Sequence, residues 1–175
     1  MMYRVFPLVS VVLALLVGCG PADPEDRSPA EPGPETARPD TVGAGLVVRD
    51  SPHSVDSTMA RLERAVKGTE PLSIMARVDH AANAETVGRS LRPTRLLVFG
   101  NPDLGTPLME ASPTTAIDLP QKVLVWADST GQVRLAYNDP QFLAERHGIS
   151  GRDDALQTIG GALRKLARRA TASEP

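Results

Sequence analysis

Hydrophobic positions after residue 44 follow two different spacings, and these spacings predict an ordered series of strands and helices. Short β-branched or continuous apolar runs are typical of strands, and they lie at residues 45–49, 72–78, 95–100, 122–127 and 132–137. Apolar residues three or four positions apart predict helices at residues 53–67, about 80–90, 140–147 and from 150 onward, with a weaker helical piece at 106–111. The order is therefore β-α-β-α-β-(α)-β-β-α-α.

This order predicts the α+β class. We expect a two-layer α/β sandwich with one mixed sheet of about five strands and the helices packed on it. The pair of strands at 122–127 and 132–137 is separated by a short loop containing Gly131, which favours a hairpin. Ser150 and Asp153 have the spacing of a capping box, so they are expected to open the last helix.

A different apolar pattern occupies the start of the chain. Arg4 precedes an apolar run from Val5 to Val17, and small residues follow it, which is the pattern of a secretory signal. Leu16-Val17-Gly18-Cys19 resembles a bacterial lipobox, in which the cysteine is lipidated and becomes the new N-terminus. Two alternatives are a transmembrane helix, for which the run is short of the usual length of about 20 residues, and an ordinary signal peptide with an incidental cysteine.

The lipobox interpretation explains Cys19, which is the one cysteine of the chain and cannot form an internal disulfide. Two or more acyl chains hold a protein stably on a membrane, whereas one does so only marginally. Gly20 follows the cysteine where an aspartate would favour retention in the inner membrane. We therefore expect an exported lipoprotein in the cell envelope, on the periplasmic side of the outer membrane if the cell has two membranes.

Residues 19–43 predict a tether between this anchor and the folded part. Proline, acidic and small residues dominate the segment, and such a composition buries too little apolar surface to fold. The expected organisation is a signal peptide at 1–18, the lipidated Cys19 with a disordered proline-rich tether at 19–43, and one domain at 44–172.

Charge and metal-ligand spacing exclude several functions. Without residues 1–18 the chain holds 18 basic and 21 acidic side chains, whereas a nucleic-acid-binding domain is usually basic. The three histidines, His53, His80 and His147, have no metal-ligand spacing. Met75 and Met109 are interpreted as core residues rather than copper ligands. We therefore expect no nucleic-acid partner, no metal and no cofactor.

Several separated blocks resemble one family. They are Asp79-His80-Ala81-Ala82-Asn83-Ala84, residues 91–102, Gly105-Thr106-Pro107-Leu108-Met109, residues 119–126, Tyr137-Asn138 and Arg146-His147-Gly148. In this order they resemble the DUF302 domain over roughly residues 45–150. The resemblance implies a two-layer α/β fold that tends to form homodimers, and it implies no activity, because the family has no established reaction.

Polar residues at the ends of the predicted strands are the candidate site. If the strands at 72–78 and 95–100 are neighbours, several of these residues could share one pocket for a small polar or anionic ligand. The candidates are Asp79, His80, Asn83, Arg95, Asn101, Tyr137 and Asn138. The structural alternative is that Asp79 only caps a helix, that Asn101-Pro102 only ends a strand and that Asn138-Asp139-Pro140 only begins a helix.

Three hypotheses for function follow. The first is an anchored, dimeric module that binds a small molecule or an envelope protein, without catalysis. The second is an enzyme that uses His80 as a general acid or base, although no nucleophile motif accompanies it. The third is a scaffolding homodimer, whose sheet edge or helix face makes the contact.

Overall fold

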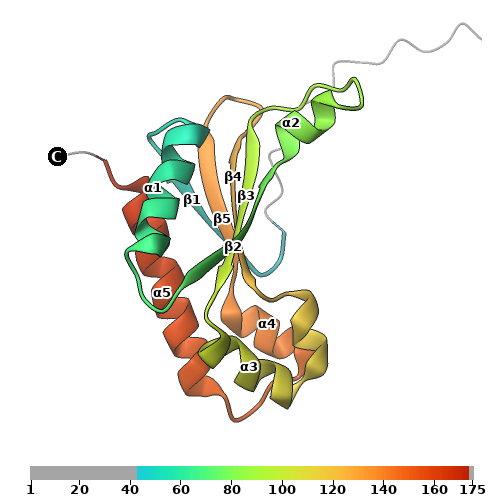
Figure 1. The fold of residues 1–175 in the computed structure, drawn as a ribbon, viewed down its shortest axis with the longest axis vertical. Helices are drawn as coiled ribbons and strands as arrows, with labels where there is room; N and C mark the ends of the chain where they lie inside the picture. Colours follow the sequence, from blue (N-terminus) through green and yellow to red (C-terminus); the bar gives the residue numbers. More distant parts are fainter. Residues whose placement is uncertain (1–42, 174–175) are drawn as a thin grey trace, which may run out of the picture. The chain divides into compact units, whose positions relative to one another are not determined.

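The computed structural model describes residues 43–173, and their strands form one sheet (Figure 1). The sheet has five strands in the order β1-β5-β4-β3-β2. All four strand pairs are antiparallel. The strands are β1 (Leu46–Ser51), β2 (Ser73–Asp79), β3 (Thr94–Gly100), β4 (Gln121–Ala127) and β5 (Val133–Asn138). The fold is α+β, as expected, but the sheet is antiparallel throughout rather than mixed.

Two helices cover one face of this sheet (Figure 1). They are α1 (Val55–Lys67) and α5 (Asp153–Thr171). Their apolar residues, spaced three and four apart, are buried against the inward side chains of the strands, which is how an amphipathic helix stabilises a fold. The core contains Leu62 and Val66 of α1, Leu163 and Leu166 of α5, and Leu97 of β3.

The other face of the sheet has no helix packed on it within residues 43–173. Side chains alternate between the two faces along a strand, so the register assigns every second residue to this open face. Its larger apolar members are Leu46, Val48, Val78, Leu96, Val98, Leu124 and Trp126.

Shorter helices lie at the two ends of the sheet. The helix α2 (His80–Glu85) follows β2 at one end, and at the other end lie α3 (Pro102–Ala111), the 3-10 helix η1 (Pro113–Ile117) and α4 (Pro140–His147) (Figure 1). Asn101 begins α3, because its side-chain oxygen accepts a hydrogen bond from the backbone N–H of Asp103 at 3.0 Å and Pro102 fits the first helical turn.

Some boundaries differ from the sequence-based predictions for local reasons. The helix expected at 106–111 begins at Pro102, and the one expected to run to about residue 90 ends at Glu85. The capping box at Ser150 does not form: α5 begins at Asp153, the preceding Arg152 makes no side-chain cap, and Gly151 has a left-handed backbone.

Residues 43–173 contain neither a membrane-spanning helix nor a cluster of metal ligands. Among residues 43–173 we find no helix that has both the length and the apolar character needed to cross a bilayer. The same residues contain no group of three or more His, Cys, Asp and Glu side chains placed to hold a metal. Cys19, the predicted signal peptide and nearly all of the predicted tether lie outside the described residues.

Candidate functional site

The residues predicted to share one pocket lie at opposite ends of the sheet. Strands β2 and β3 are neighbours, as the prediction required, but they are antiparallel, with Asp79 opposite Arg95 and Ser73 opposite Gly100. The carboxyl end of β2 therefore lies at the amino end of β3. The structure brings Asp79 and Arg95 together and places Asn101 at the far end, so the expected single pocket does not form.

Asp79 and Arg95 belong to an ion-pair network at the end near α2. The Arg95 guanidinium lies 3.0 Å from the Asp79 carboxylate and 2.7 Å from that of Asp56 on α1. The backbone N–H of Ala82 donates to Asp79 at 3.0 Å. This bond, and then the bond and charge of Arg95, hold the pKa of Asp79 below its usual value. The network joins α1, β2, β3 and the start of α2.

His80 and Asn83 lie on α2 beside this network, and both side chains are exposed. The carboxylate next to His80 in sequence is already occupied by Arg95 and by the cap of α2. The geometry therefore adds no support to the use of His80 as a general acid or base.

Tyr137 and Asn138 end β5, at the same end of the sheet as Asn101. Tyr137 is buried on the helix-covered face, and this burial raises the pKa of its hydroxyl, while the nearby guanidiniums of Arg164, Arg49 and Arg168 act in the opposite direction. Neither Tyr137 nor Asn138 lines the pocket that contains Asn101.

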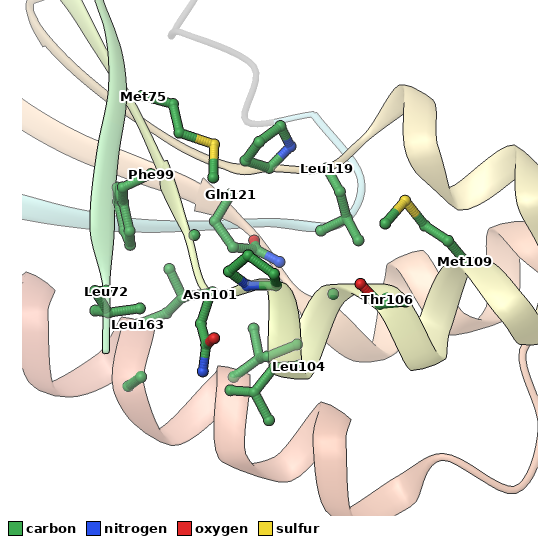
Figure 2. Close-up of a pocket in the computed structure, with 16 residues that line it drawn as sticks. Leu72, Met75, Phe99, Asn101, Leu104, Thr106, Met109, Leu119, Gln121 and Leu163 are labelled. Carbon is green, nitrogen blue, oxygen red and sulfur yellow. The ribbon is translucent and has the colours of Figure 1, made fainter. Parts of the chain in front are cut away.

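That pocket lies at the end of the sheet near α3 and has a volume of about 200 Å³ (Figure 2). Its walls come from the end of β3, the start of β2 and the residue before it, α3, the segment before β4, and α5. They are almost entirely apolar, and the principal side chains are Leu72, Met75, Phe99, Leu104, Met109, Leu119 and Leu163.

Two glycines and one turn of helix leave this space open. A Cβ atom on Gly100 would lie 3.3 Å from the Cβ of Pro120 and 3.7 Å from the Cε of Met75, and one on Gly105 would lie 3.6 Å from Leu119. Met75 and Met109 were expected in the core, and instead they line the pocket; Met75 is 51% exposed. Flexible thioether side chains of this kind adapt to different apolar ligands.

The polar group of most interest in the pocket is Gln121, the first residue of β4. It is only 8% exposed, yet its side-chain amide has no hydrogen-bond partner among residues 43–173. Figure 2 shows this side chain extending into the middle of the pocket. The amide atoms are not fully buried, so they are open to pair with a molecule that enters the pocket. Sequence reasoning missed Gln121, since a glutamine at the start of a strand carries no distinctive signal.

Asn101 is the second polar group at the pocket. Its Oδ1 is used in capping α3, and its amide nitrogen has no partner within the described residues. The site therefore offers an apolar volume with one complete carboxamide and one further N–H donor group. Such a site can hold a mainly apolar molecule and orient it by one polar group.

A second side-chain cluster was also missed. The Nε2 of His147 lies 2.7 Å from the Asp118 carboxylate, and its Nδ1 lies 3.0 Å from the Thr114 hydroxyl. The His147 side chain is 6% exposed, so these contacts join the end of α4 to η1 and the residue that follows it.

The family model described as "Domain of unknown function DUF302" matches residues 47–166. The chain belongs to the DUF302 family. A solved structure, titled as an uncharacterized conserved DUF302 protein from Bacillus stearothermophilus, matches 73% of this chain and 99% of its own, with a TM-score of 0.65 and 17% identity. That likeness concerns the fold. Its 99% coverage shows that the solved chain contains little besides this fold.

Curated relatives of this DUF302 chain carry a different name. Two proteins named "Fluoride-specific ion channel FluC 1", from Brucella suis and Brucella abortus, are each 40% identical over 130 residues. The match covers 72% of this chain and 51% and 48% of the two relatives. The chain therefore spans about half the length of the curated relatives it matches.

Proposed function

We propose that this DUF302 chain is a ligand-binding module of the cell envelope, and that its ligand occupies the pocket between β3, α3 and α5. The observation that carries this proposal is the amide of Gln121, which lines an otherwise apolar cavity and has no hydrogen-bond partner within residues 43–173. A ligand that pairs with this amide would gain a hydrogen bond inside a mainly apolar cavity.

The chemistry of the walls limits the ligand to a class. A cavity of about 200 Å³ takes a molecule of small size, and the apolar walls favour a hydrocarbon body. A carboxamide both donates and accepts, and Asn101 adds a second N–H donor. The matching polar group is therefore a carbonyl-containing head, such as an amide or a carboxylic acid.

The envelope location rests on the sequence of residues 1–19. Cys19 is the proposed lipidation site, and the proline-rich residues that follow are the proposed tether. A Cys19→Ala variant should release the protein from the membrane fraction or leave its signal uncleaved. A protein of unaltered mass that stays in the membrane fraction would remove this part of the proposal.

Binding is tested on the fragment 43–175 with octanamide, octanoate and 1-octanol as probes, followed by amide NMR. These probes share one chain length and differ in the head. Octanamide should shift the signals of residues around Asn101, Gln121 and Ala162. Gln121→Leu should weaken octanamide binding about tenfold, the usual worth of one hydrogen bond to a buried partner, and should leave 1-octanol less affected.

The matched control is Gln141→Leu, which alters an exposed glutamine on α4 and should leave binding unchanged. Ala162→Phe fills the pocket from α5 and should abolish binding of all three probes. Failure of all three probes to shift the pocket residues, or equal binding by the Ala162→Phe protein, would reject the pocket as a ligand site.

A role beside a fluoride transporter is a second candidate, and the 40% identity to half of two proteins named as fluoride channels favours it. The match covers only about half of each relative, so fluoride conduction by the whole proteins is not carried over to this chain. A link to fluoride transport is therefore only proposed here. Deletion of the chain in its host should lower growth in fluoride if the two roles are linked. Equal growth of the deletion strain over a fluoride series would end this candidate.

We also propose a homodimer as the assembled form. The support is the open face of the sheet, where apolar residues such as Leu96, Leu124 and Trp126 have no helix over them within residues 43–173. A second copy of the same face would remove these side chains from water.

A further inference from the structure

Basic side chains gather on the outer surface of the helix layer. Within residues 43–173 the chain has 16 basic and 14 acidic side chains, so the domain as a whole is close to neutral. Half of the basic ones belong to α1, α5 and the adjacent edge strand β1. They are Arg49, Arg61, Arg64, Lys67, Arg164, Lys165, Arg168 and Arg169. We call this set the cationic face.

The cationic face is built by helical spacing and by the packing of two helices. Residues 155–171 of α5 include four basic and no acidic side chains. Lys165 and Arg169 are four residues apart and share one side of the helix, and Arg169 lines a groove with Arg61 and Arg64 of α1. Arg164 and Arg168 share the other side, where they lie near Tyr137 and Arg49. The charges thus flank α5 on both sides.

Most residues of the cationic face form no ion pair with a carboxylate within residues 43–173. No carboxylate lies within ion-pair distance of Arg64, Lys165, Arg168 or Arg169 among residues 43–173, and all four are exposed. Glu63, the acidic residue in the middle of α1, is already bound to Arg77 at 2.9 Å and lies near Lys67. Like charges held together without partners repel each other, so an anionic partner would relieve the repulsion.

Part of this pattern has a structural explanation within the fold. Basic residues in the last turns favour the negative end of the helix dipole, and Arg61 donates to the carbonyls of Ala170 and Ala172 at the end of α5. That explanation covers each helix separately. It does not explain why the antiparallel packing of α1 and α5 brings both sets to one shared groove.

We propose that the cationic face docks on an anionic membrane surface, with lipid phosphates along the groove between α1 and α5. A lipid surface fits better than nucleic acid, because within residues 43–173 the aromatic residues that stack on bases are not on this face. Phe99 and Tyr137 are buried, Trp126 lies on the opposite face of the sheet, and Phe142 belongs to α4 at one end of it. This docking is independent of the pocket, and it leaves the open face of the sheet directed away from the membrane.

The test measures sedimentation of the fragment 43–175 with lipid vesicles. The fragment should bind vesicles of phosphatidylcholine with about 30 mol% phosphatidylglycerol and not vesicles of phosphatidylcholine alone. Binding should fall when NaCl is raised from about 50 mM to about 500 mM, because salt screens surface charge. Lys165→Gln with Arg169→Gln should weaken binding roughly 25-fold, at about fivefold for each cation removed.

The matched control is Arg89→Gln with Arg92→Gln, which removes the same charge from the exposed connection between α2 and β3. This control should change vesicle binding by less than about twofold, and circular dichroism should show that both variants stay folded. Equal loss in the two double variants would mean that net charge alone acts, and it would overturn the proposal. The absence of binding to the anionic vesicles at low salt would do the same.

Two further experiments distinguish a membrane surface from a free phosphate anion and from nucleic acid. The first titrates the fragment with inorganic phosphate in a calorimeter. If phosphate saturates the fragment and displaces it from vesicles at a similar concentration, the partner of the cationic face is a free anion and not a membrane surface. A DNA duplex that binds more tightly than the vesicles at the same salt would replace it by nucleic acid. Weak or absent binding of both, together with vesicle binding, supports the membrane surface.

Discussion

Asp128 is the residue whose carboxylate is most fully enclosed by donors. It lies at the turn between β4 and β5, is 2% exposed, and accepts hydrogen bonds from the Thr130 hydroxyl at 2.7 Å and from the N–H groups of Thr130 and Gln132 at 2.9 and 3.0 Å. The Thr130 hydroxyl is the largest cause that lowers the pKa of Asp128, and Arg134 adds to it. The charged form is therefore the one that stabilises this turn.

This lowered pKa predicts a dependence of stability on pH. The contribution is fully present above the pKa of about 3.8 that the residue has when unfolded, and it is lost as the pH falls through the lower folded value. Asp128→Asn should lower the thermal midpoint at pH 7, and the gap to the wild type should narrow below about pH 4. Thermal unfolding between pH 7 and pH 2 measures this, and a gap that stays constant would contradict it.

Gly45 is a second residue at which a substitution has a clear expected effect on stability. Its φ of 78° belongs to the left-handed region, and an added Cβ would overlap the ring of Phe142 on α4. Gly45→Ala should therefore destabilise by about 2–4 kcal/mol, from backbone strain and overpacking together. Gly131→Ala is the control: its φ is 84° but nothing lies near its Cβ, so it should lose about 1 kcal/mol, from strain alone. Equal losses in urea unfolding would show that Phe142 does not set the cost.

At the scale of elements, the corner of η1 and α4 is stabilised by His147. Replacing it by Ala leaves Asp118 and Thr114 without this shared partner, and the loss of one part-buried and one exposed hydrogen bond should cost about 1–3 kcal/mol. The thermal midpoint should then fall by about 3–10 °C for a domain of this size. His80→Ala serves as the control, since His80 is exposed on α2, and equal midpoints for the two variants would contradict the role of His147.

The same scale shows what hydrophobic spacing can and cannot predict. The core-facing residues of α1 and α5, such as Leu62 and Leu163, lie at the positions that the periodic pattern assigned. The start of α3 was missed because Asn101-Pro102 reads as a strand end, although a capping Asn and a Pro at the first turn also begin a helix. Local residues permit both, and the packing of α3 beside α5 decides between them.

At the scale of the whole molecule, the proposed homodimer predicts a role for the open face. The fragment 43–175 should sediment as a dimer, and Trp126→Glu should make it a monomer, because a charge would then be buried without a partner in the interface. Ile117→Glu is the control, since Ile117 is 73% exposed on η1 and lies off this face. A wild-type monomer at all accessible concentrations in analytical ultracentrifugation would reject the dimer.

The fold class was predictable from the sequence, whereas the site was not, and strand direction explains the difference. Element order is a local property, and it predicted α+β. Whether Asn101 lies beside His80 depends on whether β2 and β3 run parallel or antiparallel, and their separate sequences do not encode that choice. The importance of Gln121 is likewise visible only once α3, β3 and α5 have closed around it.

The start of the domain also has a mechanical consequence. Gly45 precedes the edge strand β1, its carbonyl accepts from the N–H of Asp139 at 2.8 Å, and the Phe142 ring covers it. A force applied to the preceding residues therefore acts on this hydrogen bond and on the Phe142 contact before it reaches the sheet. After Gly45, the six residues of β1 are all paired with β5. A force along the strand therefore strains all of these pairs at the same time, in shear. A chain pulled from its N-terminal side along this strand yields all at once instead of unzipping pair by pair.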